Sequence, residues 1–309
     1  MMQQINNLIH GRETYAVYYG DKFVMKRPLP TLSIAECDKW LDKQHNAMTA
    51  INKIRMVENP AYNVPLMHFI NDDEYQVLEE RAPGRPLSRD LYRALSRRQQ
   101  YDIINGIANF LVDMHESSPA QTIERHKISD ELKMARLSKF IRTKMSIWFT
   151  KNEIRQMSRI HDQIMEFEYD TRQVWTHCDL NPGNILYEPD ENKLSFIDFA
   201  DCGYSFVYRD IFGPVPMELE IYKYVYDAYK RLHNKSLFPM PSIKNEQLRE
   251  IMKYRVISIA VKRFIKASDD LRVNPANQKS INNNIAKVAF MREQMQQIQN
   301  VEHRATKMK

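Results

Sequence analysis

The stretch from Trp175 to Gly203, WTHCDLNPGNILYEPDENKLSFIDFADCG, constrains the fold more than any other part of the chain. Two β-prone runs, Ile185–Tyr187 and Leu194–Ile197, flank a turn rich in Pro, Asp and Asn, which predicts a β-hairpin. Asp179 precedes the first run, and Asp198 directly follows the second. We therefore expect polar side chains to gather where the apolar runs end.

The oxygen-bearing side chains of this stretch are spaced for a metal site. Asn184 follows Asp179 by five residues across a Pro-Gly loop, and Asp198 follows Asp179 by nineteen. Hard divalent cations such as Mg²⁺ take oxygen ligands, often one or two carboxylates together with substrate phosphates. We expect Asn184 and Asp198 to hold the cation, and Asp179 to act as the catalytic proton acceptor. A hairpin with surface acids and no chemistry is the alternative, which the three spacings disfavour.

The order H-x-D-x-x-x-x-N followed by D-F-x resembles the catalytic loop and metal-binding aspartate of the protein-kinase-like fold. In detail, HCDLNPGNIL with IDFADCG is similar to the aminoglycoside phosphotransferase and choline kinase superfamily, the kinases of small hydroxylated molecules. Protein kinases have Arg and Gly where this chain has Cys178 and Ala200. Cys178 also replaces the glycine common in the small-molecule kinases. Residues 175–212 carry the specific part of the resemblance.

The resemblance implies an α+β, bilobal protein-kinase-like fold. Residues 1–82 would form a small N-lobe with an antiparallel sheet and one helix, and residues 83–309 a larger, mainly helical C-lobe. The sequence of the N-lobe agrees with a sheet, since Gln4–Ile9, Tyr15–Tyr19 and Lys22–Met25 read as three short strands. Gly20-Asp21 supplies the second turn.

Two helices are predicted from apolar residues at helical spacing. The first begins after Ser33, which with Glu36 has the spacing of a capping box. The apolar face of this helix extends to Ile51. The second begins after Ser96 and runs to Met114. His115 ends it, and the helix dipole explains a C-terminal cation there, so we assign His115 no catalytic role. Further helices are predicted over residues 123–169, Met217–Leu232 and Glu246–Ile265.

The resemblance also assigns residues to the nucleotide. Lys26 ends the third strand at the position of the lysine that holds the α- and β-phosphates. Thr14 lies in the first turn, which contains a single glycine, and we expect it to contact phosphate. Backbone groups near Glu80 and Ala82, in the extended segment between the lobes, would bind adenine.

The partner of Lys26 departs from the family pattern. The family pairs its lysine with a helix glutamate, and Gln44 occupies that position here. A neutral amide can orient Lys26 but loses the charge-assisted hydrogen bond, which is roughly twice as strong. Glu36 is the nearby acidic alternative, although its capping role is the stronger interpretation. The sequence leaves the choice between Gln44 and Glu36 open.

Supporting and substrate residues follow from the same resemblance. His177 and Asp210 are expected to support the catalytic loop structurally. Asp201, Glu218 and Tyr222 are candidates for binding the acceptor. In this family the C-terminal helices, here predicted to include Glu218 and Tyr222, form a wall of the acceptor pocket. Acids there would bind a cationic amine, and tyrosines would stack on a sugar or cover a quaternary ammonium. A helix with an aromatic core face and a polar outer face is an equally good account of each helix residue.

Composition restricts the setting. A net charge of +6 suits an anionic ligand such as ATP. No dense Arg/Lys tract alternates with aromatics, so no nucleic-acid partner is expected. No run of about 18 apolar residues predicts a membrane span, and the N-terminus lacks a signal-peptide pattern. Three cysteines without metal or disulfide spacing favour a reducing cytoplasm.

We therefore predict an ATP-dependent phosphotransferase, with GTP as the alternative donor and Mg²⁺ as cofactor. The acceptor would be the hydroxyl of a small molecule resembling an aminoglycoside, choline or homoserine. A divergent protein kinase and a catalytically weak pseudokinase that serves as a binding module are the alternative hypotheses. The sequence predicts neither the identity of the acceptor nor the oligomeric state.

Overall fold

We describe a computed structural model of the 309-residue chain. The chain forms two compact units: Met1–Thr122 with Arg172–Met240, and Ile123–Thr171 with Pro241–Lys309. The structure describes residues 8–11, 15–117, 150–152, 155, 173–211 and 219–233. The fold below is that of the first unit. The helix predicted over Glu246–Ile265 lies outside the described residues, as does nearly all of the one predicted over 123–169.

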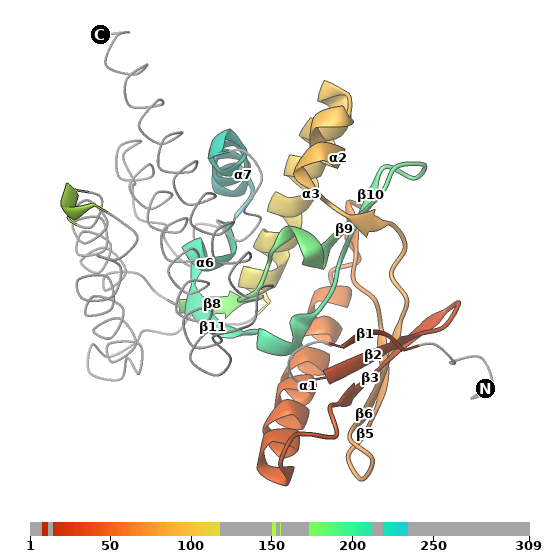
Figure 1. Cartoon of the computed structure of the whole chain (residues 1–309). Helices are drawn as coiled ribbons and strands as arrows, with labels where there is room; N and C mark the ends of the chain where they lie inside the picture. The colour runs from red at the N-terminus through yellow and green to blue at the C-terminus, as the bar shows by residue number, and fades with distance from the viewer. Residues whose placement is uncertain are drawn as a thin grey trace, which may run out of the picture. The chain divides into compact units, whose positions relative to one another are not determined.

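A five-stranded antiparallel sheet forms the N-terminal part of this unit (Figure 1). Its strands follow the order β1 (Leu8–Gly11), β2 (Tyr15–Tyr19), β3 (Phe23–Pro28), β6 (Gln76–Glu80) and β5 (Met67–Asn71). The prediction for β2 is confirmed. The prediction for β3 ended too early, because pairing with β2 continues to Pro28. Of the strand predicted over Gln4–Ile9, only the last two residues are described; they belong to β1, which continues to Gly11.

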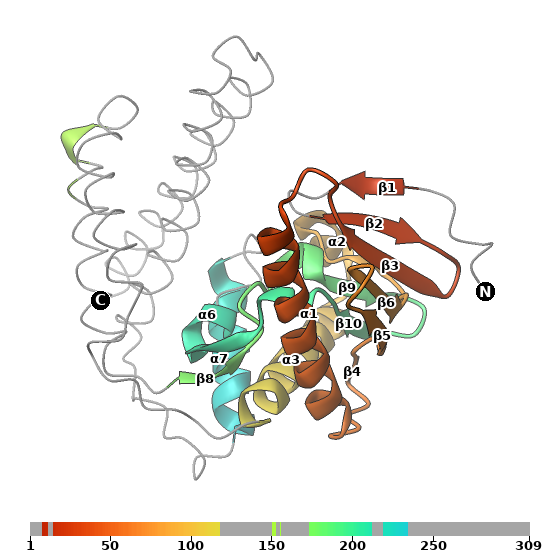
Figure 2. The same cartoon turned by 90° about the horizontal axis from the view of Figure 1, so that it is seen from below.

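Helix α1 (Ile34–Arg55) lies beside this sheet (Figures 1 and 2). The predicted capping box is present, since both the backbone N–H and the hydroxyl of Ser33 donate to Glu36 Oε2, at 2.8 and 2.7 Å. One face of the helix is buried, as apolar residues at intervals of three and four require. The residues of that face are Trp40, Gln44, Ala47, Ala50, Ile51 and Ile54.

The predicted hairpin forms the centre of a second sheet. Its strands follow the order β4 (Tyr62–Asn63), β10 (Lys193–Phe196), β9 (Ile185–Glu188) and β7 (Arg85–Pro86). Strand β8 (Gln173–Thr176) precedes the hairpin in the sequence and β11 (Gly203–Phe206) follows it. These two strands pair with each other, antiparallel. Gly84, before β7, has φ +94°, and an added Cβ would lie 2.7 Å from the Tyr187 carbonyl carbon, so this turn requires glycine. The division into lobes after residue 82 stays a prediction.

The remaining helices are α2 (Arg89–Ala94), α3 (Arg97–Glu116), α6 (Val207–Ile211) and α7 (Leu219–Leu232), with short 3₁₀ turns η3 (Pro182–Asn184) and η4 (Phe199–Asp201). Helix α3 runs through the core of the unit. Its Phe110 stacks on Phe196 of β10, with ring centroids 3.8 Å apart, and meets Tyr62 and Phe199 edge-on. This aromatic cluster fixes the hairpin against α3, and so fixes the loops at both ends of the hairpin.

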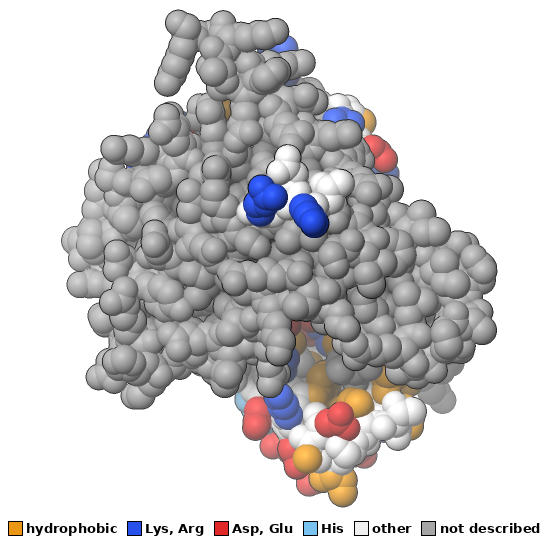
Figure 3. Space-filling view, turned by 60° about the vertical axis from the view of Figure 1, so that its left-hand side comes forward, with side chains coloured by type: hydrophobic (Ala, Val, Ile, Leu, Met, Phe, Trp, Pro, Cys, Tyr) orange, Lys and Arg blue, Asp and Glu red, His pale blue; other side chains and the backbone are white. Residues whose placement is uncertain are grey.

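The described surface is mixed in character. Figure 3 shows acidic, basic and hydrophobic side chains interspersed among the described residues on one face. No helix within the described ranges is long and apolar enough to cross a membrane.

Candidate active site

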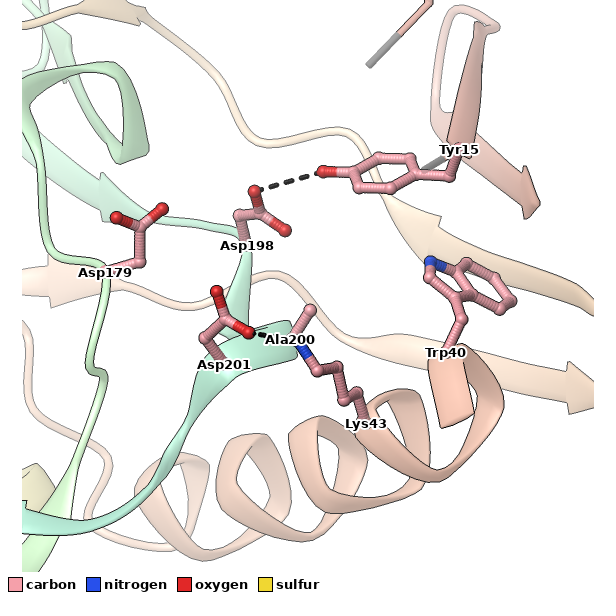
Figure 4. Close-up of a pocket in the computed structure, with 7 residues that line it drawn as sticks. All are labelled: Tyr15, Trp40, Lys43, Asp179, Asp198, Ala200 and Asp201. Atoms are coloured by element: carbon pink, nitrogen blue, oxygen red, sulfur yellow. Dashed lines mark hydrogen bonds and ion pairs between the residues drawn. The ribbon is translucent and has the colours of Figure 1, made fainter. Parts of the chain in front are cut away.

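Asp179 and Asp198 line one pocket, although Asp198 follows Asp179 by nineteen positions in the sequence. Asp179 follows β8, and Asp198 follows β10. Figure 4 shows both carboxylates in the pocket opposite side chains from β2 and α1. The residues that line it are Tyr15, Trp40, Lys43, Asp179, Asp198, Ala200 and Asp201. The structure thus brings the two predicted acids into a shared site.

Local hydrogen bonds orient the Asp179 carboxylate. Asn184 Nδ2 donates to the Asp179 backbone oxygen at 2.8 Å and to Asp179 Oδ2 at 3.1 Å. Asn181 Nδ2 also donates to Oδ2, at 3.1 Å, while its own Oδ1 accepts from the Gly183 N–H. No hydrogen bond within the described part of the chain uses Asp179 Oδ1. One carboxylate oxygen is therefore held by amides, and the other can receive a proton.

The carbonyl oxygen of the Asn184 side chain is a buried acceptor in need of a ligand. Asn184 is 1% exposed, and its Oδ1 has no hydrogen-bond partner among the described residues. Buried polar atoms are nearly always satisfied, and an orphan costs about 1–3 kcal/mol. An amide oxygen beside carboxylates matches the ligand preference of Mg²⁺. The described residues contain no group of three or more His, Cys, Asp or Glu that could hold a metal.

Asp198 is held in an unusual backbone conformation. Its φ is +65°, in the left-handed region. The preceding residue, Ile197, is held by a hydrogen bond from its N–H to the Asn184 backbone oxygen at 3.0 Å. Tyr15 Oη donates to Asp198 Oδ2 at 3.1 Å, and Lys26 Nζ lies 3.7 Å from Oδ1. Non-glycine residues in this region are strained and cluster at functional sites. The bend places the carboxylate between the hairpin and the five-stranded sheet.

His177 links the two acidic loops. Its Nε2 lies 3.0 Å from the Ile197 carbonyl oxygen, and its Nδ1 lies 3.4 Å from the Asp179 backbone nitrogen. A carbonyl can only accept, so Nε2 carries the hydrogen and Nδ1 accepts from Asp179. The imidazole therefore fixes the loop before Asp179 relative to the strand end before Asp198.

Asp210 lies under the same loop. It is fully buried and accepts from the backbone N–H groups of His177, at 2.6 Å, and of Cys178, at 2.9 Å. His115 Nε2 lies 3.3 Å from Asp210 Oδ2, and His115 Nδ1 lies 2.8 Å from Tyr229 Oη. Burial alone would raise the pKa of Asp210, but the hydrogen bond and charge of His115 outweigh it and lower the pKa. The carboxylate is thus stabilised in its ionised, hydrogen-bond-accepting form.

His115 corrects the sequence analysis. It was explained there by the dipole of α3, but in the structure it is completely buried and joins Asp210 to Tyr229 of α7. The position of the residue in the last turn of a helix gave no indication of these partners. A histidine on the apolar face, directly after Met114, was the available signal.

Lys26 is paired with neither Gln44 nor Glu36. Its Nζ lies 2.9 Å from Glu79 Oε1 on β6, and both side chains are buried. Burial alone would lower the pKa of Lys26, but the charges of Glu79 and Asp198 outweigh it and raise the pKa. Glu36 is occupied by the cap of α1. Gln44 is buried on α1, and its assignment to the nucleotide stays a prediction.

The Ala82 N–H is a candidate donor in the backbone between the two sheets. The Glu80 N–H donates to the Leu66 oxygen and the Arg81 N–H to the Lys22 oxygen, each at 2.8 Å. No backbone hydrogen bond from the Ala82 N–H is found within the described part of the chain. Of the backbone N–H groups at Glu80 and Ala82, that of Ala82 is therefore the available donor, and the adenine assignment stays a prediction. The Glu80 side chain accepts from the Leu66 N–H instead.

The other predicted residues have mixed outcomes. Asp201 lines the pocket and forms an ion pair with Lys43. Tyr222 belongs to α7, but its side chain is not described. Thr14 and Glu218 lie outside the described residues. Glu79, Lys43 and Trp40 were not predicted from the sequence.

Comparison with known proteins places this site in a family. The model of the phosphotransferase enzyme family matches residues 4–213, which is more than half of the chain. A search of curated proteins finds no match.

Solved structures share the fold at low sequence identity. Aminoglycoside 2'-phosphotransferase-IIIa in its GDP complex is 13% identical with a TM-score of 0.61, over 94% of this chain and 93% of that one. A choline/ethanolamine kinase family protein from Mesorhizobium loti is 11% identical with a TM-score of 0.61, over 95% and 88%. Spectinomycin phosphotransferase, solved with ADP and spectinomycin, is 16% identical with a TM-score of 0.55, over 93% of each chain.

These findings confirm the predicted α+β fold of the protein-kinase-like class. The family match spans β2, β3 and α1 as well as the two acidic loops, and so includes every residue that lines the pocket. The chain belongs to the phosphotransferase enzyme family.

Proposed function

We propose that the protein transfers the terminal phosphoryl group of a nucleoside triphosphate, ATP or GTP, to a hydroxyl of a small molecule in a Mg²⁺-dependent reaction. Membership of the phosphotransferase enzyme family supports the reaction class. Neighbours of the same fold were solved with GDP or with ADP, which supports a nucleotide as donor. The cytoplasmic location expected from the sequence belongs to this proposal.

The observation that carries the proposal is the orphaned Oδ1 of Asn184, buried where its own amide nitrogen binds Asp179. Asn184 Oδ1 and the Asp198 carboxylate would hold Mg²⁺, which when bound neutralises negative charge on the phosphates. Buried acceptors without a partner are few in folded proteins, so this one supports a ligand at the site.

Asp179 has the position of the proton acceptor. Its Oδ2 is fixed by the amides of Asn181 and Asn184, so the carboxylate cannot turn away from the pocket. Its Oδ1 would accept the proton of the acceptor hydroxyl as the oxygen attacks phosphorus. General-base help of this kind contributes about 10²–10⁴ in rate. His177 and Asp210 would keep the loop in place through their backbone hydrogen bonds.

The five-stranded sheet would hold the rest of the nucleotide. Lys26, kept charged by Glu79 and Asp198, would contact the α- and β-phosphates. The Ala82 N–H would bind the base, and Thr14 is assigned to phosphate. Positioning and electrostatics account for most of catalysis in phosphoryl transfer.

A cationic small molecule is the acceptor class that we propose. Asp201 at the pocket would attract a cationic acceptor, with Glu218 and Tyr222 as further candidates. Neighbours of the fold include an aminoglycoside phosphotransferase and a choline/ethanolamine kinase family protein.

The test is a nucleotide-consumption screen of the full chain with Mg²⁺ and ATP or GTP. Acceptors are aminoglycosides, choline, ethanolamine, homoserine, sugars and nucleosides, with Asp198→Ala as the inactive control. Consumption that requires both Mg²⁺ and one acceptor class supports the proposal. In a parallel assay the protein is incubated with γ-³²P-labelled ATP and a cell lysate, which is then separated into protein and small-molecule fractions. Label that appears only in the protein fraction would favour a protein kinase instead. Nucleotide binding without any turnover would favour a pseudokinase.

A further inference from the structure

Two hydrogen-bond donors on α1 face the pocket and have no role in the proposed reaction. Trp40 and Lys43 are three residues apart, so they lie on one face of the helix about one turn apart. Both line the pocket that contains Asp179 and Asp198, and Figure 4 shows them on the side opposite Asp179. Their shared position indicates a common ligand.

Trp40 presents a donor without an acceptor. The residue is 5% exposed, and its Nε1 has no hydrogen-bond partner among the described residues. An indole N–H can only donate, and a buried donor left unsatisfied costs about 1–3 kcal/mol. In Figure 4 the nitrogen lies on the edge of the ring that faces Tyr15 and Asp198. An acceptor that enters the pocket would satisfy it.

The ion pair of Lys43 is weak enough for Lys43 to exchange its partner for another anion. Its ammonium forms an ion pair with Asp201, and the two side chains are 44% and 51% exposed. Ion pairs this exposed contribute about 0–1 kcal/mol, so exchanging Asp201 for another anion costs little. The pair thus keeps Lys43 beside the pocket without fixing it there.

The charge of the pocket selects the ligand. Three carboxylates line it, and its other donor, the Tyr15 hydroxyl, already donates to Asp198. Lys26 does not line this pocket, and the proposed function assigns it to the inner phosphates. An incoming anion therefore needs the α1 donors to offset the acids. In phosphoryl transfer the group that must approach Asp179 is the terminal phosphate, whose oxygens accept several hydrogen bonds.

We propose that Trp40 Nε1 and Lys43 Nζ bind the terminal phosphate of the nucleotide, and that Asp201 holds Lys43 when that phosphate is absent. The inference rests on the proposed function and deepens it. Lys26 would serve the inner phosphates and the α1 pair the transferring one. The pair would therefore distinguish a triphosphate from a diphosphate, and its loss would weaken binding of the triphosphate alone.

The test compares two nucleotides that differ by one phosphate. Calorimetric titration of the full chain uses the Mg²⁺ complexes of ADP and a non-hydrolysable ATP analogue, with the guanine pair in parallel. Trp40→Phe keeps the ring and removes the N–H, and Lys43→Met keeps the stem and removes the charge. Each should weaken triphosphate binding about five- to tenfold, the effect of one lost hydrogen bond, and change diphosphate binding less than about twofold.

Matched controls exist for both variants. Trp175 also has a buried indole nitrogen without a partner among the described residues, but it does not line the pocket. Lys39 lies on the exposed face of the same helix. Trp175→Phe and Lys39→Met should leave both affinities unchanged.

The failures of the two proposals are distinguishable. If the wild-type protein binds neither nucleotide, the proposed function fails and the inference with it. If the wild type binds and consumes the triphosphate but the variants lose both nucleotides equally, or neither, only the inference is overturned. Thermal unfolding identifies a Trp40→Phe protein that does not fold. In that case Lys43→Met, whose native side chain is half exposed, decides the question.

Discussion

Two regions meet at the pocket. They differ in the sequence separation between each polar side chain and the residues that bind it. In residues 173–211, Asp179 is held by Asn181 and Asn184, which are at most five residues away. In residues 15–80, Lys26 on β3 takes its partner Glu79 from β6, and reaches Asp198 beyond that. A short motif fixes the first set of contacts, whereas strand pairing fixes the second. The first could be predicted from spacing, and the second could not.

The largest expected effect tests the local set. Asp179→Asn removes the proton acceptor but keeps an oxygen that can accept from Asn181 and Asn184. We expect kcat to fall by about 10²–10⁴, because general-base help is lost. MgATP affinity and thermal stability should stay close to wild type. Steady-state kinetics on the acceptor found in the screen, together with calorimetry, measure both.

Asp190→Asn, an exposed change in the turn of the same hairpin, is the control and should leave kcat unchanged. Undiminished turnover in Asp179→Asn would remove Asp179 from the chemistry, even if the protein still bound nucleotide.

The next effect is on stability. Each oxygen of Asp210 accepts one backbone N–H of the catalytic loop, from His177 and Cys178. In Asp210→Asn, one of these N–H groups would face an NH₂ and lose its acceptor. The buried partner His115 would lose the charge opposite it. We expect the free energy of unfolding to fall by about 3–5 kcal/mol, measured by urea denaturation. The exposed Asp227→Asn on α7 should change it by less than about 0.5 kcal/mol.

The difference in unfolding free energy between wild type and Asp210→Asn should depend on pH, because it depends on the pKa of Asp210. The pKa is lower in the folded protein, so the carboxylate stabilises the fold above the unfolded-state value of about 3.9. This contribution is lost as the pH falls through the lower, folded-state pKa. The gap between wild type and Asp210→Asn should therefore be constant above about pH 5 and narrow below about pH 4. A gap that stays constant down to acid unfolding would contradict the role given to the carboxylate.

The sheet region is tested by its own ion pair. Glu79→Gln leaves the buried Lys26 with only the longer contact to Asp198, at 3.7 Å. We expect a loss of about 2–3 kcal/mol in unfolding free energy, below the full cost of breaking a buried pair because Asp198 remains. In a Lys26→Met background, Glu79→Gln should cost almost nothing, since it then removes an unpaired buried charge. Double-mutant cycles at neutral pH give the coupling.

Glu80→Gln is the matched control. Glu80 is the next residue of the same strand, but its ion pairs with Arg55 and His68 are long, at 3.6 and 3.8 Å, and partly exposed. The free energy of unfolding should therefore fall by less than about 1 kcal/mol in Glu80→Gln. If Glu79→Gln were as mild as Glu80→Gln, strand pairing would not supply the partner of Lys26.

These contrasts explain how far the sequence could be interpreted. The hairpin and the cap formed by Ser33 and Glu36 follow from spacing over a few residues. The convergence of Asp179 with Asp198, nineteen positions apart, was expected because their motif resembles that of a known family. Glu79 did not stand out, because an acid in a strand ordinarily points to solvent and only burial beside Lys26 makes it a partner. His115 was missed because its partners lie 95 and 114 residues away, on elements whose packing no local pattern specifies.

The smallest expected effect concerns Cys178, where the catalytic-loop motif has cysteine in place of the glycine common in the small-molecule kinases. Cys178 has φ +66°, a conformation that glycine adopts without strain and other residues adopt at a cost. Its thiol recovers part of that cost, since Sγ lies 3.0 Å from Thr176 Oγ1. Cys178→Gly should therefore raise the free energy of unfolding by no more than about 1 kcal/mol. Cys178→Ala removes the same thiol but keeps the strained backbone, so it should lower the free energy instead. A gain in both variants would assign the cost to the thiol rather than to the backbone. A loss in both would mean that the thiol contact outweighs the strain, and that cysteine at this position is stabilising in its own right.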